Sequence, residues 1–230
     1  MIDVKEEQQY QELKKLAQKL HVPIPEAFLE LEVRDKDGNV IQRYRQRSHS
    51  WTRNAYNCMF SQLAGKAYDD STFGPGKLSY KETGGSIRYT SYCGGSDQPV
   101  DGIAQGYRAP AGYDTRGIMV GSGTNAESFE DYSLQTKIAN GTGAGQLVYV
   151  ESEPHSKTYA DTTMKNTLVR YFNNNSGGDI SVNEVALVWH ILGGQSFDFL
   201  FSRDKLASTV TVPNTGQLKV TYTIQLTYPA

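Results

Sequence analysis

The hydrophobic and polar positions of this chain alternate most regularly near its C-terminus. Apolar side chains occupy every second position from 218 to 226, with polar side chains between them, and this period of two is typical of a half-buried strand. Shorter apolar runs, separated by Gly- and Asn-rich turns, occur at 117–121, 146–150, 167–172, 180–189 and 197–201. We therefore expect a mainly β protein, with an antiparallel β-sandwich of the jelly-roll or Greek-key type over residues 115–230.

One of these runs changes phase within itself. Ile180 and Val182 follow one alternation, whereas Val185 and Leu187 follow the other. An extra residue in a strand shifts the alternation in this way, so the pattern predicts a β-bulge at residues 183–184.

The N-terminal segment has the spacing of a helix. The helix is expected over residues 3–20 and must end before Pro23, because proline disfavours helix at the residue that precedes it. Its apolar side chains form a narrow stripe, at Tyr10, Leu13, Ala17 and Leu20. A narrow stripe fits a helix that docks on a partner or on a second copy, and it also fits packing on the same domain. We interpret residues 1–22 as a docking or oligomerisation helix, with these four side chains as candidate interface residues.

Residues 23–65 predict a β-hairpin followed by a second, short helix. Apolar and charged side chains alternate over residues 29–34, and Gly38 can supply the positive φ that the turn requires. The apolar face of the helix is expected to consist of Trp51, Ala55, Cys58, Met59 and Leu63. We expect this unit to pack on the sandwich and to be followed by long Gly- and Tyr-rich loops over residues 66–114.

Four arginines form the one basic feature of the chain. Arg43, Arg45 and Arg47 occupy alternate positions of a predicted strand and so share a face, and Arg53 follows after the turn. They can pair across the hairpin with Glu30 and Glu32. They can also form an electrostatic docking site, and all four are candidate interface residues on that interpretation. Acidic residues nearly balance basic ones here, which favours an acidic protein surface over nucleic acid as the partner.

Composition excludes several classes of protein. The chain has 230 residues, of which 38% are hydrophobic, and no run approaches the roughly 18 apolar residues of a membrane span. The formal net charge of −2 does not favour a nucleic-acid binder. The N-terminus lacks the apolar segment of a secretion signal, so we expect synthesis in the cytoplasm and no membrane partner.

Side chains that could carry chemistry are scattered along the chain. The four histidines lack metal-ligand spacing, and no nucleophile elbow or nucleotide-binding loop occurs. The glycines at 121–123 and 141–145 superficially resemble phosphate-binding loops, but no helix is expected to follow, and we interpret them as turns. A glycosidase needs two carboxyls at a defined separation, and we interpret as surface charges Glu127, Glu130, Glu151 and Glu153. We therefore expect no catalytic site, no metal and no cofactor.

Several motifs of the C-terminal half follow one another in a recognisable order. They are Gly121-Ser-Gly-Thr, Asp131-Tyr-Ser-Leu, and the segments 168–173, 179–187, 201–204 and 210–222. In this order, and with a similar opening over residues 28–57, they resemble structural proteins of tailed-bacteriophage virions over about two thirds of the chain. The resemblance implies a component of the head, the head–tail junction or the tail. It also implies other virion proteins as partners and a symmetric homo-oligomer or multi-copy array.

The sequence thus favours a non-enzymatic virion protein that acts through protein–protein contacts, in which Tyr and Arg supply much of the binding energy. An alternative is a carbohydrate-binding or receptor-binding adhesin on the same fold, because aromatic rings beside Asp can form a sugar platform. The candidate ligand-facing residues are Tyr92, Asp97, Tyr107 and Tyr113. A β-sandwich hydrolase is a third alternative.

Overall fold

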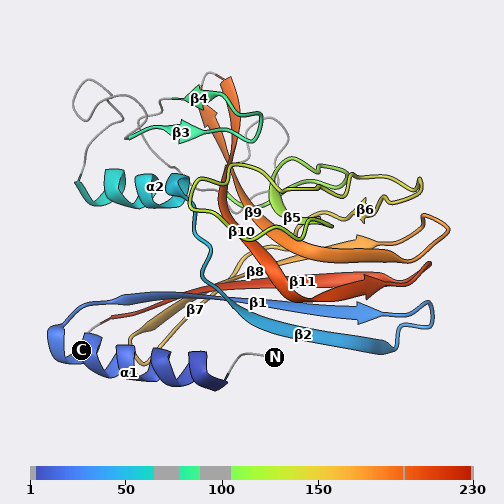
Figure 1. Cartoon of the computed structure of the whole chain (residues 1–230). Coiled ribbons are helices and arrows are strands. Elements are labelled where there is room, and N and C mark those ends of the chain that lie inside the picture. Colours follow the sequence, from blue (N-terminus) through green and yellow to red (C-terminus); the bar gives the residue numbers. More distant parts are fainter. Residues whose placement is uncertain (1–3, 65–77, 89–104, 194, 229–230) are drawn as a thin grey trace.

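Figure 1 shows the chain as a computed structural model that describes residues 4–64, 78–88, 105–193 and 195–228. Two antiparallel β-sheets pack on each other, and two helices lie near one end of them. The prediction of a mainly β sandwich of the jelly-roll or Greek-key type, with an N-terminal helix and one further short helix, is confirmed. The helices are α1 (Val4–Leu20) and α2 (Arg53–Ala64).

The larger sheet runs in the order β2, β1, β11, β8 and β6, and β7 also pairs with β8. In chain order its strands are β1 (Ile24–Arg34), β2 (Val40–Ser48), β6 (Val148–Tyr149), β7 (Ser156–Ala160), β8 (Thr163–Asn173) and β11 (Gln217–Thr227). The smaller sheet consists of β5 (Gly117–Gly121), β9 (Ile180–Gly193) and β10 (Gln195–Val212). A separate short ribbon is formed by β3 (Tyr80–Lys81) and β4 (Ile87–Arg88).

The strand connections are nested. β8 and β11 pair in the larger sheet, while β9 and β10, which lie between them in the chain, pair in the smaller sheet. The inward residues of neighbouring strands meet in register, as at Leu31 opposite Val220 and Leu29 opposite Tyr222. These side chains are almost fully buried and share one core with apolar residues of β9 and β10. The apolar positions that alternate in the sequence of these strands are therefore the positions that face this core.

The sandwich begins earlier in the chain than the predicted boundary at residue 115. β1 pairs with β11 along residues 24–34, and β2 pairs with the other edge of β1. The hairpin is thus an integral part of the larger sheet and does not pack on it from outside. Local alternation identifies a strand, but only pairing between distant segments decides which sheet the strand joins.

The predicted irregularity at residues 183–184 is present, but the extra residues belong to the partner strand. Lys205 pairs with Glu184 and Val210 pairs with Val182, so residues 206–209 of β10 face a single residue of β9. A second shift, between Leu200 and Ser202, leaves the intervening Phe201 without a partner in the ladder. Bulges of this kind bend a strand and redirect its side chains.

Arg170 of β8 hydrogen-bonds to the backbone of β5 and of the segments that precede β5 and follow β6. Its side chain is fully buried and donates to five backbone carbonyls at 2.6–3.2 Å, those of Pro110, Tyr113, Arg116, Ile118 and Val150. Burial lowers the pKa of Arg170 to about 10, so the guanidinium remains charged at neutral pH. The five carbonyls replace the water that this cation loses on folding.

The larger sheet continues past the smaller one at the end where α1 lies (Figure 1). There β10 bridges to Glu82 beside the β3–β4 ribbon, and β9 bridges to Gly106. At this end the smaller sheet no longer covers the inward side chains of the larger sheet. Met164 is 48% exposed, although it points to the same side of β8 as the buried Leu168. We call this uncovered part of the larger sheet the overhang.

Candidate interaction surface

Helix α1 lies against the outer face of the larger sheet, below β1 and β2 in Figure 1. Lys14 Nζ lies 2.9 Å from Glu26 Oε2. Arg47 lies 2.7 Å from Glu26 Oε1 and 2.6 Å from Glu7 Oε2, and its guanidinium lies 3.9 Å from the centre of the Tyr10 ring. The side chains of Glu26 and Arg47 are almost fully buried. Helix and sheet are therefore joined by a buried ion network.

The members of this network support one another's charges. Burial alone would raise the pKa of Glu26, but hydrogen bonds, above all from Arg47, outweigh burial and lower that pKa. Burial would likewise lower the pKa of Arg47, but its hydrogen bonds to Glu7 and Glu26 raise it. Both groups stay ionised at neutral pH. Removing Arg47 would leave the buried Glu26 with Lys14 as its cation, and removing Glu26 would leave the buried Arg47 with Glu7 as its anion.

The four predicted interface residues of α1 divide into two pairs. Ala17 is the buried residue of the helix, and Tyr10 is half-buried against Arg47. For these two, the alternative of packing on the same domain is the one that the structure shows. Leu13 and Leu20 instead remain exposed, at 46% and 62%. Leu16, which lies outside the predicted stripe, is 54% exposed.

The arginines also have partners within the chain. Arg43 lies 3.2 Å from Glu32 and Arg45 lies 2.8 Å from Glu30, which is the pairing across the hairpin that was one of the two alternatives. Arg53 pairs with Glu130 on a distant loop. With these three and Arg47 neutralised by acidic side chains, the structure does not support an electrostatic docking site at Arg43, Arg45, Arg47 and Arg53.

Helix α2 is bound to the protein through its polar side. Its buried residues are Asn54, Asn57 and Ser61. The predicted apolar face is divided in the structure. Its members Trp51, Ala55 and Cys58 pack against the core, whereas Met59 and Leu63 are 47% and 83% exposed.

Hydrogen bonds to β3 and β10 explain this orientation of α2. Asn54 Nδ2 donates to the carbonyls of Lys81 and Leu200 at 2.8 and 3.1 Å, and Asn54 Oδ1 accepts from the backbone N–H of Lys81. Asn57 Nδ2 donates to the carbonyl of Ser79 at 2.7 Å. An unpaired buried amide is costly, so these bonds set the rotation of the helix. The polar residues at 54, 57 and 61 have helical spacing, and this was the signal in the sequence that the apolar pattern obscured.

A cavity of about 410 Å³ lies between the two helices and the overhang. Tyr10 borders it from α1, Tyr56 and Met59 border it from α2, and Ile224 borders it from β11. Further walls are aromatic side chains of the core, namely Trp51, Tyr107, Trp189 and Phe201. On the α1 side the lining residue is Tyr10, which also contacts Arg47.

A buried polar cluster lies beside this cavity and joins the two sheets. Ser48 of β2, which lines the cavity, donates to Asp204 Oδ2 at 2.8 Å and contacts the hydroxyl of Tyr222. Ser202 donates to the same carboxylate oxygen at 2.9 Å. Complete burial raises the pKa of Asp204 to about 6, since the two hydroxyls compensate only part of the lost hydration. This site was not found from the sequence, because its members come from three distant strands.

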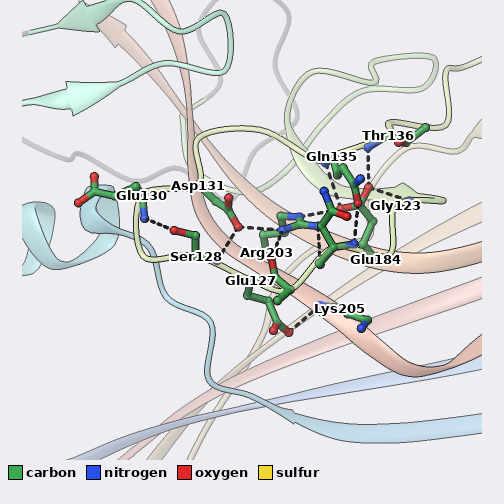
Figure 2. A network of polar contacts seen from close by, with 12 residues as sticks. Gly123, Glu127, Ser128, Glu130, Asp131, Gln135, Thr136, Glu184, Arg203 and Lys205 are labelled. Carbon is green, nitrogen blue, oxygen red and sulfur yellow. Dashed lines mark hydrogen bonds and ion pairs between the residues drawn. The ribbon is translucent and has the colours of Figure 1, made fainter.

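The Gly121–Gly123 turn packs against the side-chain carboxylate of Glu184. Glu184, fully buried on β9, accepts hydrogen bonds from the backbone N–H groups of Gly123, Gln135 and Thr136 at 2.8–3.1 Å (Figure 2). A Cβ at either glycine would overlap the Glu184 carboxylate. The glycines therefore make room for a structural carboxylate, and the interpretation of this segment as a turn agrees with its geometry.

Arg203 extends this network to the preceding loop. It lies 2.7 Å from Glu184 Oε2 and 2.9 Å from Asp131 Oδ2, and it donates to the carbonyls of Asn125 and Ala126. In Figure 2 the guanidinium lies between the two carboxylates. Glu127, which was interpreted as a surface charge, accepts a hydrogen bond from the backbone of Lys205. Glu127 and Asp131 thus bind this loop to β10.

The predicted ligand-facing loop is only partly within the described residues. Tyr92 and Asp97 lie outside them. Tyr107 is buried, with its ring 4.7 Å from that of Trp189 in an edge contact, because the bridge at Gly106 holds this segment against β9. It lines the cavity between the helices. Tyr113 is 43% exposed and stacks against Arg116.

Among the described residues, neither helix has the length and apolar character needed to cross a membrane. The same part of the chain contains no group of three or more His, Cys, Asp or Glu side chains placed to hold a metal ion. Comparison of the chain with protein-family models, with curated proteins and with solved structures found no match.

Proposed function

We propose that this protein is a non-enzymatic structural component of a tailed-phage virion and that it acts through protein–protein contacts. The observation that carries the proposal is the outward apolar side of α2, at the end of the molecule where α1 also exposes leucines. Large apolar side chains gathered on one part of a surface are typical of interaction sites. The resemblance of the motifs between residues 121 and 222 to virion proteins supplies the biological setting.

The orientation of α2 supports a binding role for its outer side. The stripe at Tyr56, Met59 and Leu63 could have been buried by rotating the helix, but Asn54 and Asn57 hold it outward through buried hydrogen bonds. Burying three such side chains would stabilise the fold by several kcal/mol. In the structure these side chains stay exposed, and the fold lacks this stabilisation. Such exposure is expected where a partner protein covers the surface.

A carbohydrate-binding or receptor-binding adhesin is the second candidate, and one observation favours it. The cavity between the helices is bordered by Trp51, Trp189 and Tyr107, with the hydroxyl of Ser48 and the ring of His49 nearby. Aromatic rings beside hydrogen-bonding groups suit a sugar ring. Glycan binding that is lost in Trp51→Ala would support this candidate over a protein contact.

Mass spectrometry of gradient-purified particles tests the main proposal, using a phage whose genome encodes this chain. We expect the chain in the particles at a constant copy number relative to the major capsid protein. A non-structural protein of the same phage, abundant in the lysate, serves as the control for adhering contaminants. If the chain occurs in the lysate but is lost from purified particles together with that control, the proposal is wrong.

A further inference from the structure

We infer that the cavity of about 410 Å³ beside the overhang is a receptor for an aromatic side chain of a partner protein. The segment that carries this side chain lies along Tyr56 and Met59 of α2. The inference rests on the proposed function and specifies the chemistry of the partner. It differs from the second candidate function, in which a sugar ring would occupy the same cavity.

One wall of the cavity is a set of aromatic rings that contact one another. The ring of Trp189 stacks on that of Phe201, with 5.5 Å between the centroids and 11° between the planes. Tyr107 meets the Trp189 ring edge-on, with 4.7 Å between the centroids, and all three residues line the cavity. Aromatic rings favour such stacked and edge-to-face contacts, so the ring of a partner side chain can extend this arrangement.

The carboxylate that borders the cavity already has partners. Glu26 lines the cavity and accepts from Arg47, Lys14 and Gln225. Residues 54–64 of α2, which form another wall, contain no charged side chain. A charged group that entered the cavity would lose its hydration without gaining an ion pair, and this loss is costly. The cavity therefore favours an uncharged group.

The serine hydroxyl of the wall is also in use. Ser48 donates to Asp204 and contacts the hydroxyl of Tyr222. A sugar ring carries several hydroxyl groups, and each of them needs a hydrogen-bond partner in exchange for water. Tyr56 and His49 could supply such partners, but their side chains are exposed. An aromatic side chain needs one such partner at most, so these walls favour it over a sugar.

The cavity is continuous with the outward apolar side of α2. Tyr56 and Met59 line it and are each 47% exposed, so the same two side chains belong to the wall and to the surface. Leu63 follows Met59 after about one helical turn and is 83% exposed. A polypeptide that places a ring in the cavity can therefore cover this stripe with the residues beside the ring. An aromatic anchor in a pocket, surrounded by weaker contacts, is usual in protein interfaces.

The chain contains two tryptophans, Trp51 and Trp189, and both line the cavity. Their side-chain N–H signals in a nitrogen–proton correlation NMR spectrum therefore report on it, and Trp51→Phe assigns them. The probes are N-acetyl-tryptophanamide for an aromatic residue, N-acetyl-leucinamide for an aliphatic residue and methyl glucoside for a sugar. We expect the aromatic probe to shift both signals with a Kd of about 1 mM or tighter. The aliphatic probe should bind about tenfold more weakly, and the sugar should cause no shift.

Two variants locate the bound probe. Ala55→Phe fills the cavity from α2, and Tyr56→Ala removes a wall ring that is partly exposed, so that this substitution is mild for the fold. We expect each to weaken binding of N-acetyl-tryptophanamide by about tenfold. Leu13→Ala, at an exposed position of α1 outside the lining of the cavity, is the matched control and should leave binding unchanged. Circular dichroism of each variant confirms that the sandwich is folded.

Any of several results would overturn the inference. One is the absence of a shift at about 10 mM N-acetyl-tryptophanamide, and another is equal binding of the aliphatic probe. Shifts caused by the sugar alone would favour the adhesin instead. Tighter binding of free indole than of N-acetyl-tryptophanamide would mean that the backbone of a partner does not fit. The particle composition that tests the proposed function is measured independently of the cavity, so either proposal can fail alone.

Discussion

The two helices of this protein are attached to the same sandwich in opposite ways. α1 contacts the larger sheet through a buried ion network around Arg47. In contrast, α2 contacts β10 of the smaller sheet and the segment at β3 through asparagine side chains that hydrogen-bond to backbone groups. Both helices leave apolar side chains exposed. The difference teaches that the apolar face of an amphipathic helix is not always its buried face, because specific polar contacts can determine its rotation.

The largest expected effect follows from removing the centre of the α1 network. In Arg47→Ala the nearly buried carboxylate of Glu26 loses its closest cation, and we expect a loss of about 3–5 kcal/mol in the free energy of unfolding. Urea denaturation measures this loss, and faster proteolysis within residues 4–20 would show that α1 has detached. Arg43→Ala is the matched control, since Arg43 is exposed and its ion pair is worth at most about 1 kcal/mol. Equal effects of the two substitutions would contradict the assigned network.

The next effect concerns Asp204, beside the cavity between the two helices. Its folded-state pKa is raised from 3.8 to about 6, so the folded protein binds this proton more tightly than the unfolded chain. The resulting stabilisation is complete below about pH 3.8 and is lost as the pH rises through about 6. The shift corresponds to about 3 kcal/mol.

Asp204→Asn should remove the decrease in stability between pH 4 and 6, as followed by thermal denaturation across that range. The ion network of α1 has the opposite dependence: the pKa of Glu26 is lowered from 4.5, so its contribution is present above pH 4.5 and is lost as the pH falls through the folded pKa. Acid should therefore release α1 while it stabilises the sheet contact at Asp204. An unchanged pH profile in Asp204→Asn would show that another group titrates in this range.

A smaller effect distinguishes the two sides of α2. Asn54→Ala leaves the backbone groups of Lys81 and the carbonyl of Leu200 without this partner, and we expect a loss of about 1–3 kcal/mol. Leu63→Ala should change the unfolding free energy of the monomer by less than about 0.5 kcal/mol, since Leu63 is 83% exposed. Chemical denaturation in dilute solution compares the two variants. A larger loss in Leu63→Ala would mean that the apolar side of α2 is the one that holds the fold.

Much of the fold could be predicted from local pattern. The alternation in β11 and in β1 identified both strands, and the phase change in β9 located an irregular pairing, although not the strand that carries it. The candidate interface was predicted only in part, because Leu13 and Leu20 are exposed while Tyr10 and Ala17 face the sheet. The apolar spacing of Met59 and Leu63 did not show that this side of α2 is exposed, because spacing alone does not reveal the partners of Asn54 and Asn57.

The sequence by itself determined the secondary structure and the sandwich class, because side-chain periodicity and turn residues act over a few neighbouring positions. The tertiary structure alone decided that residues 24–48 belong to the larger sheet and that Glu184 occupies the glycine turn. It also decided that the arginines are neutralised and that α2 presents its apolar side outward. Each of these depends on pairing between segments far apart in the chain. Such pairing depends on which buried polar groups can form hydrogen bonds or ion pairs and on which apolar surfaces can be buried.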